Sequence, residues 1–318
     1  GDSAAQGVGC GNQGNQALEN ANQRDPRDGT VHQRVGQVRC LPGILPPLTF
    51  SESLETTRIH SIAGRLAPGT GLMAERPFCA PHHSASVASM IGGGSNAKPG
   101  EVSLAHNGVL FLDELPEFSR NTLEALRQPL EDGVVSVTRI HNQAQYQSSF
   151  MMVASMNPCP CGFYGSKTKK CRCSAKDIRR YLDRISGPLL DRIDIQVEVD
   201  AVPVKEISEG GAAESSAEVG ARVRKVRELQ QARYAQDGIH CNAQLDAGLS
   251  KKYCPMTPEA TALLHMAVER MGMSMRAYGR VVKVARTIAD MDGADTIGTT
   301  HVAEAIQYRE LDGKYWKS

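Results

Sequence analysis

Aromatic residues are scarce in this sequence: they make up 5% of it, with a single tryptophan. That scarcity disfavours a single-strand binder that stacks bases on aromatic rings, such as an OB-fold. No apolar run approaches the roughly 18–20 residues that a transmembrane helix needs. Neither sign of charge dominates, because 36 Lys and Arg residues face 35 Asp and Glu residues. Composition therefore identifies no charged partner, and any basic surface must be local.

The sequence also lacks a recognisable export signal, since the residues from Gly1 onward contain neither the charged nor the apolar block of a signal peptide. We therefore expect a cytoplasmic protein with reduced thiols. Its nine cysteines are an odd number, and four of them form two Cys-x-Cys pairs. This pattern indicates a candidate metal site rather than a disulfide scaffold.

The 318 residues exceed one typical domain and predict a large domain plus a smaller one. Residues 1–40 are polar, show no helical or strand period, and are expected to be loop or disorder. Apolar runs at 109–112 and 150–154 are typical of strands buried in a parallel sheet, and the alternating run 193–199 predicts another strand. A Gly/Ala/Glu/Ser-rich stretch at 201–216 has the composition of a linker.

These elements predict an α/β fold, with a parallel sheet flanked by helices over residues 41–200 and an all-helical domain over 217–318. In the first domain we expect a helix over 52–66 and a β-hairpin over 134–140 and 144–146. Helices of the second domain are expected at 217–236, 258–271, 275–291 and 300–311.

Two adjacent carboxylates, Asp113 and Glu114, directly follow the strand candidate 109–112. Open α/β sheets bind ligands at the carboxyl ends of their strands. In nucleotide hydrolysis one acid holds the magnesium shell and a second polarises the attacking water. Asn157 follows the next apolar strand and could orient that water. The alternative is that the two acids only open a turn before Pro116. We favour it less, because a second predicted strand is also followed by a polar residue, Asn157.

Two arginines extend the pattern. Arg192 precedes the run 193–199, from where it could reach a phosphate in a neighbouring subunit, and Arg276 begins a helix of the helical block. Each taken alone is expected to be a surface arginine. Here, however, both arginines follow the acidic pair and Asn157 along the sequence, and in this order they are candidate stabilisers of phosphate charge.

Four segments together carry a resemblance to a known family. They are 80–86 (Ala-Pro-His-His-Ser-Ala-Ser), 99–118, 156–162 (Met-Asn-Pro-Cys-Pro-Cys-Gly) and 276–278 (Arg-Ala-Tyr). With them the chain resembles the magnesium-chelatase-like AAA+ ATPases of the competence protein ComM type, from Leu41 to near Leu311. The resemblance implies a P-loop-type core with a helical lid, and ATP and Mg²⁺ as cofactors. It also implies a hexameric ring that moves branched or single-stranded DNA in branch migration during recombination and natural transformation.

The same resemblance implies a role for each candidate residue. Asp113 and Glu114 would be the Walker B acids that bind Mg-ATP, with Asp113 on the magnesium ion, and Asn157 would be sensor 1. Arg192 would be the arginine finger, given in trans to an ATP site between subunits, and Arg276 would be sensor 2. The family carries another domain before its motor, so this chain is expected to be a fragment.

A phosphate loop of the form Gly-x-x-x-x-Gly-Lys-Ser/Thr is absent from the whole sequence. The glycines of such a loop let backbone N–H groups wrap the phosphates, and its Lys neutralises them. The family carries the loop shortly before its Leu-Pro-Gly-Ile-Leu-Pro-Pro segment, which here is 41–47. We therefore expect nucleotide binding by this chain to be impaired.

A change of reading frame would explain the missing loop. Read forward by one base, the codons of residues 24–32 permit Gly-Thr-Pro-Gly-Thr-Gly-Arg-Ser, and those of 19–24 permit an apolar run suited to the preceding strand. The Lys position cannot be Lys in that frame. Our hypothesis is that residues 1–40 are an out-of-frame translation of the phosphate-binding segment, which the nucleotide sequence of the gene would decide.

Four thiols fall within one loop: Cys159, Cys161, Cys171 and Cys173. Four cysteines at close spacing suit tetrahedral zinc, although Cys-x-Cys pairs are less usual than Cys-x-x-Cys. Unmetallated loop cysteines are the alternative. The neighbouring pair His82 and His83 is expected to make hydrogen bonds rather than to bind a metal.

The densest basic stretch runs from Lys167 to Arg184. It is equally compatible with a solvated surface and with contact to DNA phosphates or a neighbouring subunit. Related ring motors carry a pore hairpin before the sensor strand, which makes the tip of the hairpin expected at 134–146 the better candidate for DNA binding. The residues there are Arg139, His141 and Asn142.

Two alternatives to a DNA motor stay open. A metal-chelatase motor subunit shares the fold and differs in its partner. A non-enzymatic remnant would only associate with a ring, which the missing phosphate loop favours.

Overall fold

The computed structural model describes residues 38, 40–93, 97–138, 143–166, 169–199, 214–311 and 315–316. Three expectations fall outside this set: those for residues 1–37, for most of the linker at 201–216, and for the tip of the hairpin. They stay predictions.

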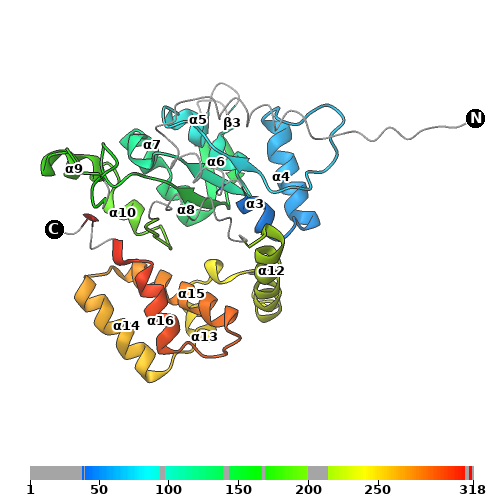
Figure 1. Ribbon diagram of the computed structural model, residues 1–318. Coiled ribbons are helices and arrows are strands. Elements are labelled where there is room, and N and C mark those ends of the chain that lie inside the picture. Colours follow the sequence, from blue (N-terminus) through cyan, green and yellow to red (C-terminus); the bar gives the residue numbers. More distant parts are fainter. Residues whose placement is uncertain are drawn as a thin grey trace, which may run out of the picture. The chain divides into compact units, whose positions relative to one another are not determined.

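A parallel three-stranded sheet, in the order β1-β4-β7, organises the first part of the chain (Figure 1). Its strands are β1 (Phe78–Cys79), β4 (Val109–Leu112) and β7 (Met151–Ala154). The central strand β4 is buried at every residue, as its unbroken apolar run predicts. The expectation that β7 is buried too is wrong, because Met151 and Ala154 are exposed and β7 pairs within the described chain only with β4.

Helices surround these strands in the first part of the chain. They are α3 (Leu41–Ile44), α4 (Phe50–Ile62), α5 (Val87–Ile91), α6 (Glu101–Leu104), α7 (Arg120–Ala125), α8 (Arg127–Asp132), α9 (Ala175–Leu182) and α10 (Gly187–Leu190). The short 3₁₀ helix η1 (Leu115–Glu117) follows the acidic pair. Leu110, Leu112, Phe118, Leu126 and Leu189 form the centre of the buried core that joins helices and sheet.

Local sequence explains where individual helices begin. Ser119 caps α7 by accepting a hydrogen bond from the Thr122 N–H at 3.1 Å. The helix expected over 52–66 is present as α4, although it ends at Ile62. Of its apolar residues, Ile59 is buried, whereas Leu54 and Ile62 are exposed.

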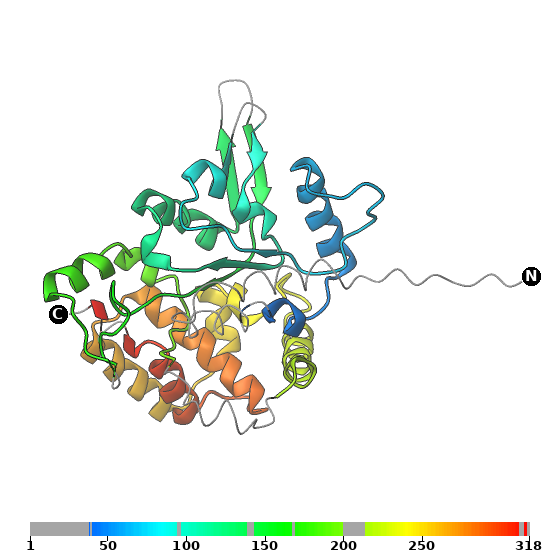
Figure 2. The same ribbon diagram turned by 45° about the horizontal axis from the view of Figure 1, so that its top comes forward.

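The predicted hairpin is present as β5 (Val134–Thr138) and β6 (Gln143–Gln147), with Val134 opposite Gln147. Figure 2 shows it extending away from the parallel sheet. Val135 and Val137 anchor its base in the core. A second antiparallel pair, β2 (Gly92–Gly93) and β3 (Lys98–Pro99), lies near α5.

The second part of the chain is helical, as predicted. Its helices are α12 (Ser216–Arg233), α13 (Ala247–Tyr253), α14 (Pro258–Met271), α15 (Met275–Met291) and α16 (Thr299–Gln307), with the 3₁₀ helix η2 (Asn242–Gln244). Leu264, Val281, Ala285, Ala289 and Val302 form a separate buried core among them. Within the described ranges, no helix combines the length and the apolar character needed to cross a membrane.

The strand predicted at 193–199 is not formed. Its backbone bonds to the helical part instead of to the sheet, because the Gln196 N–H donates to the Tyr308 carbonyl at 2.9 Å. Arg309 donates to the Ile193 carbonyl, and Arg280 pairs with Asp194 at 2.5 Å. The alternation of apolar residues therefore did not identify a strand of the sheet.

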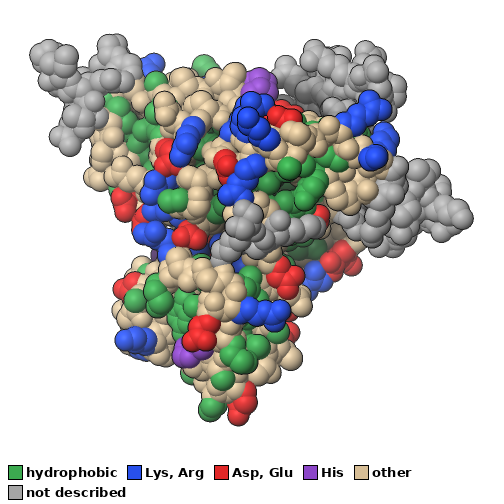
Figure 3. Space-filling view, turned by 90° about the vertical axis from the view of Figure 1, so that its left-hand side faces the viewer, with side chains coloured by type: hydrophobic (Ala, Val, Ile, Leu, Met, Phe, Trp, Pro, Cys, Tyr) green, Lys and Arg blue, Asp and Glu red, His purple; other side chains and the backbone are tan. Residues whose placement is uncertain are grey.

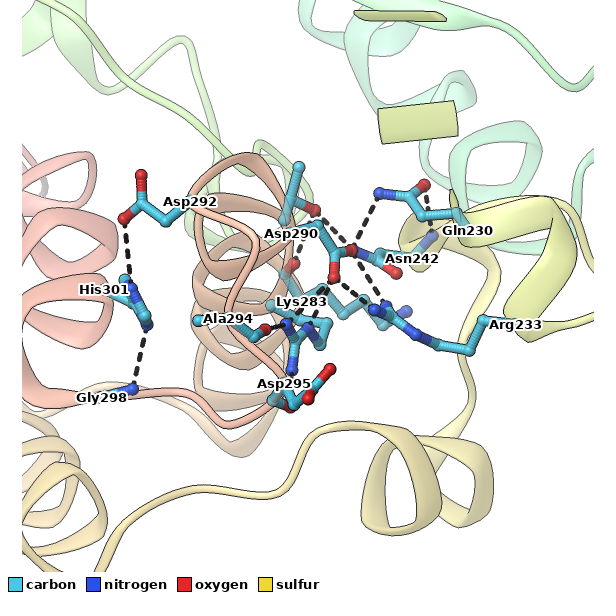
Figure 4. Close-up of polar contacts among 12 residues, drawn as sticks. Gln230, Arg233, Asn242, Lys283, Asp290, Asp292, Ala294, Asp295, Gly298 and His301 are labelled. Atoms are coloured by element: carbon cyan, nitrogen blue, oxygen red, sulfur yellow. Dashed lines mark hydrogen bonds and ion pairs between the residues drawn. The ribbon is translucent and has the colours of Figure 1, made fainter. Parts of the chain in front are cut away.

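A buried carboxylate, Asp290, holds the helical part together (Figure 4). It accepts hydrogen bonds from Arg233 at 2.6 Å, Arg286 at 3.0 Å and Asn242 at 2.9 Å. These donors come from α12, α15 and η2, so one side chain links three elements. Burial raises the pKa of Asp290, but its hydrogen bonds to Arg233 and Asn242 and the charge of Arg286 outweigh that effect and lower the pKa.

Candidate functional site

Asp113 is the first residue beyond β4, and Ser155 is the first beyond β7. The register pairs Leu112 with Ala154, so the next residue on each strand falls at the same edge of the sheet. The Ser155 hydroxyl donates to Asp113 Oδ1, which also accepts the Glu114 N–H at 3.0 Å. The sequence prediction missed Ser155, although its position matches that of Asp113 on the neighbouring strand.

Glu114 has a left-handed backbone conformation, with φ of 54° and ψ of 48°. A non-glycine residue rarely adopts this conformation, and such residues cluster at functional sites. Its side chain is 48% exposed, and Oε2 lies 3.3 Å from Nδ1 of His83. The carboxylate is therefore held toward solvent beside an imidazole. The expected hydrogen bonding of the His pair is confirmed, since His82 Nδ1 lies 2.9 Å from the Ser84 hydroxyl.

Asn157 lies three residues beyond the end of β7 and is close to Tyr181 of α9. Burial and the charges of Glu117 and Glu114 raise the pKa of Tyr181 to about 12, while a hydrogen bond with the backbone of Asn157 acts the other way. One buried tyrosine thus connects the Asn157 backbone with the acidic edge of the sheet. Sequence alone offered no signal for Tyr181.

The two candidate arginines lie together, at the carboxylate of Glu131 in α8. Arg192 is buried and donates to Glu131 Oε2, to the Pro188 carbonyl at 2.7 Å and to the Arg127 carbonyl at 3.1 Å. Arg276 donates to Glu131 Oε1 at 3.0 Å. The hydrogen bond from Arg192 and the charges of both arginines lower the pKa of Glu131.

Across the described chain, neither arginine makes a hydrogen bond or ion pair with Asp113, Glu114 or Asn157. The structure therefore brings the acids together at one edge and the arginines together at another place. Sequence reasoning also missed Glu131, the carboxylate that the two arginines share.

The four loop cysteines come together with their Sγ atoms all within 4.8 Å of one another: Cys159, Cys161, Cys171 and Cys173. The Sγ atoms of Cys159, Cys161 and Cys171 are 3.4 to 3.7 Å apart. Backbone N–H groups of Arg172 and Phe163 lower the pKa of the Cys161 thiol to about 6. Burial and the neighbouring thiols raise the pKa of the Cys173 thiol to about 12, so the four thiols are not equally ready to ionise. This group could hold a metal ion.

The donors at the acidic edge fit a magnesium ion, because carboxylate and hydroxyl oxygens are the ligands that hard divalent cations prefer. They are provided by Asp113, Glu114 and Ser155. The fit to the phosphates of a nucleotide is different, since the sequence contains no Gly-x-x-x-x-Gly-Lys-Ser/Thr loop. The cation side of such a site is present and the phosphate cradle is not.

Much of the basic charge in and after α9 is paired within the chain. Arg180 pairs with Asp177 at 3.2 Å and Arg184 with Glu117 at 2.8 Å. Figure 3 views the side of the molecule where α9 lies, and shows Lys and Arg interspersed with Asp and Glu. The DNA-binding candidates Arg139, His141 and Asn142 lie outside the residues that the structure describes.

Comparison with known families matches both parts of the chain. Residues 36–207 match the family model "Magnesium chelatase, subunit ChlI", and residues 213–309 match its C-terminal counterpart. The chain is 43% identical to competence protein ComM of Haemophilus influenzae, over 85% of the chain and 52% of that protein. It is also 43% identical to the uncharacterized protein YifB of Salmonella typhimurium, over 86% and 53% respectively.

A mycobacterial relative, the uncharacterized protein MT2965 of Mycobacterium tuberculosis, is again 43% identical, over 90% of the chain and 57% of the relative. The chain thus spans about half the length of the curated relatives it matches. The sheet flanked by helices and the helical C-terminal part agree with the AAA+ fold that the sequence predicted. The chain belongs to the magnesium chelatase ChlI family of AAA+ proteins, and within it is similar to proteins of the ComM type.

Proposed function

We propose that this chain is the motor part of a DNA-dependent ATPase whose nucleotide binding is impaired by the missing phosphate loop. The observation that carries the proposal is the edge of the sheet where Asp113, held by Ser155, adjoins the left-handed Glu114. Family membership supports ATP and Mg²⁺ as cofactors. The domains proposed are an AAA+ core over 41–200 and a helical lid over 217–318.

Each residue of the acidic edge has a distinct task in this proposal. Asp113 holds the magnesium ion, and its hydrogen bond from Ser155 fixes the carboxylate for that purpose. Glu114 takes the proton of the attacking water, which its solvent-facing position allows. Asn157 positions that water. Bound Mg-ATP would supply the phosphoanhydride bond that is hydrolysed.

The arginines act on an ATP molecule held between two subunits of a hexameric ring. Arg192 reaches this ATP from the neighbouring subunit. Its contact with Glu131 within the chain, shared with Arg276, keeps both guanidinium groups close together. Because Arg192 is buried against Glu131 within the chain, its proposed role at the ATP of a neighbouring subunit requires its release from that carboxylate.

DNA, branched or single-stranded, is the proposed substrate, with branch migration in recombination and natural transformation as the process. Support comes from the name of one relative, a competence protein, and from the hairpin β5–β6, whose tip carries the DNA-binding candidates. We also propose that the cysteine cluster binds zinc. We place the protein in the cytoplasm, a reducing compartment in which the thiols of this cluster would stay available to a metal ion.

Nucleotide binding tests the proposal. Calorimetry with Mg-ATP is expected to detect little or no binding by the chain as written. A restored chain, in which a strand and a Gly-x-x-x-x-Gly-Lys-Ser/Thr loop replace residues 1–40, is expected to bind Mg-ATP and hydrolyse it. Asp113→Asn in the restored chain should weaken the magnesium dependence of binding.

DNA then separates the alternatives. Hydrolysis by the restored chain should rise with branched DNA, whereas a metal-chelatase motor would not respond to it. If the restored chain binds Mg-ATP but never hydrolyses it, the remnant alternative holds and the proposal is wrong.

A further inference from the structure

The cysteine cluster belongs to a loop that the proposed chemistry does not use. This loop connects β7 to α9, and its described residues after Asn157 are 158–166 and 169–174. A long loop without secondary structure of its own needs something else to fix its conformation.

The spacing of the thiols matches one metal ion. With Zn–S bonds of 2.3 Å, the edges of a tetrahedron of sulfur atoms are about 3.8 Å long. The Sγ atoms of Cys159, Cys161 and Cys171 are 3.4, 3.7 and 3.6 Å apart, close to that edge and far longer than the roughly 2.0 Å of a disulfide bond. These separations suit ligands of one metal ion and exclude a disulfide bond among these three thiols.

One end of the cluster adjoins Asn157. Cys159 is fully buried and lies two residues after it, and the Gly162 N–H donates to the Cys159 carbonyl at 2.9 Å in a tight turn. Gly162 has φ of +78°, and a Cβ there would lie 3.9 Å from the side chain of Asn157. The turn of the cluster therefore lies beside the side chain of Asn157, close enough that a methyl group at Gly162 would contact it.

The other end of the cluster leads into α9. Cys173 precedes Ser174, which caps that helix by accepting the Asp177 N–H at 3.1 Å. After α9, Arg184 donates to the Pro116 carbonyl at 2.9 Å and to Glu117 at 2.8 Å, just beyond the acidic pair. The cluster is therefore linked to the acidic edge of the sheet at both ends: it lies beside Asn157 at one end, and through α9 and Arg184 it contacts the segment that follows Glu114.

Charge around the cluster favours a metal–thiolate centre. Four thiolates and one Zn²⁺ ion carry two net negative charges, which nearby cations stabilise. Lys169, Lys170 and Arg172 are exposed in the same loop, and Lys169 Nζ lies 5.0 Å from the ring centre of Phe163.

We propose that a zinc ion bound by Cys159, Cys161, Cys171 and Cys173 is a clamp that fixes Asn157 at the edge of the sheet. Removal of the metal then loosens the loop and leaves the strands and the helical part folded. Asn157 is a positioned residue, and its part in hydrolysis rests on the function proposed above. The clamp itself needs no nucleotide.

Metal content is the first test, made on the full chain purified under reducing conditions. Elemental analysis should find one zinc ion per chain. Cobalt substitution should give the visible absorption of a tetrahedral thiolate complex. Cys161→Ser and Cys173→Ser should lose the metal, whereas Cys241→Ser, outside the cluster, should keep it. A chain that holds no zinc and takes up none from an equimolar solution overturns the proposal.

Hydrogen exchange on the unmutated chain, before and after chelation, is the second test and does not depend on a variant that folds. Amides of 157–166 and 169–174 should exchange at least about tenfold faster without metal, and amides of α14–α16 should not change. If the chain binds metal but its removal leaves the amide exchange of residues 157–166 unchanged, the proposal that the metal fixes Asn157 is wrong. If the exchange responds but Asn157→Ala leaves hydrolysis by the restored chain intact, the clamp stands and the role proposed for Asn157 is wrong.

Discussion

Arg192 and Arg276 donate to the two oxygens of one carboxylate, that of Glu131. Arg192 follows α10, Arg276 lies in the first turn of α15, and Glu131 lies in α8, so one side chain connects three segments. A further hydrogen bond, from the Ser274 hydroxyl to Asp191 at 3.0 Å, adjoins this group. Because Arg192 is buried, its charge depends on the carboxylate and the two carbonyl groups around it.

Glu131→Gln should therefore lower the free energy of unfolding by about 1–3 kcal/mol, since it leaves a buried guanidinium without its charged partner. Urea denaturation measures this. Glu124→Gln is the matched control, because Glu124 pairs with Arg127, whose side chain is 38% exposed. Such a pair contributes about 0–1 kcal/mol. Equal effects of the two variants would contradict the importance given to the shared carboxylate.

Asp290→Asn should cost more, about 3–5 kcal/mol, because it leaves Arg233 and the buried Arg286 without their carboxylate. The measurement is again the free energy of unfolding. Asp183→Asn is the control, since Asp183 is exposed and pairs with the exposed Arg179. A loss below 1 kcal/mol in Asp290→Asn would show that the network adds little.

The same residue predicts a pH dependence. The pKa of Asp290 is lowered in the folded chain, below the roughly 3.9 of an unfolded one. The carboxylate of Asp290 therefore contributes its full share of the unfolding free energy above its pKa in the unfolded chain. That share is lost as the pH falls through its pKa in the folded chain. The difference in unfolding free energy between the unmutated chain and Asp290→Asn should shrink below about pH 4. A difference that stays constant down to pH 2 would contradict this.

Gly108, immediately before β4, is expected to tolerate no side chain. A Cβ there would overlap the Pro77 carbonyl oxygen and lie 2.8 Å from the proline ring, where β1 and β4 approach. Gly108→Ala should lower the free energy of unfolding by about 1–3 kcal/mol, which is measured as a lower melting temperature. Gly187→Ala is the matched control, because no heavy atom lies within 4 Å of a Cβ at that position. Equal melting temperatures for the two variants would show that the strands can shift apart.

Elements with a strong local pattern were predictable from the sequence. The apolar run at Val109–Leu112 predicted β4, and helical periodicity predicted α14 and α15 with their observed bounds. The hairpin was equally clear. These features depend on residues close together in the chain, which is why their pattern sufficed.

Long-range partners were not predictable in the same way. The run 193–199 forms no strand of the sheet, and its backbone N–H at Gln196 donates to the carbonyl of Tyr308, far along the chain. The proximity of Arg192 and Arg276 likewise depends on Glu131, which no local pattern marks. The cysteine cluster is an exception, because four thiols in one short loop can meet with little rearrangement.

Hydrolysis by the restored chain tests the central claim most directly, with Glu114 as the variable. Glu114→Gln keeps the shape of the side chain and removes the base. We predict that single-turnover hydrolysis of Mg-ATP falls by at least about a hundredfold, the usual effect of a positioned base, while Mg-ATP affinity changes little. If Glu114→Gln hydrolyses Mg-ATP as fast as the restored chain, this edge of the sheet is not the catalytic site.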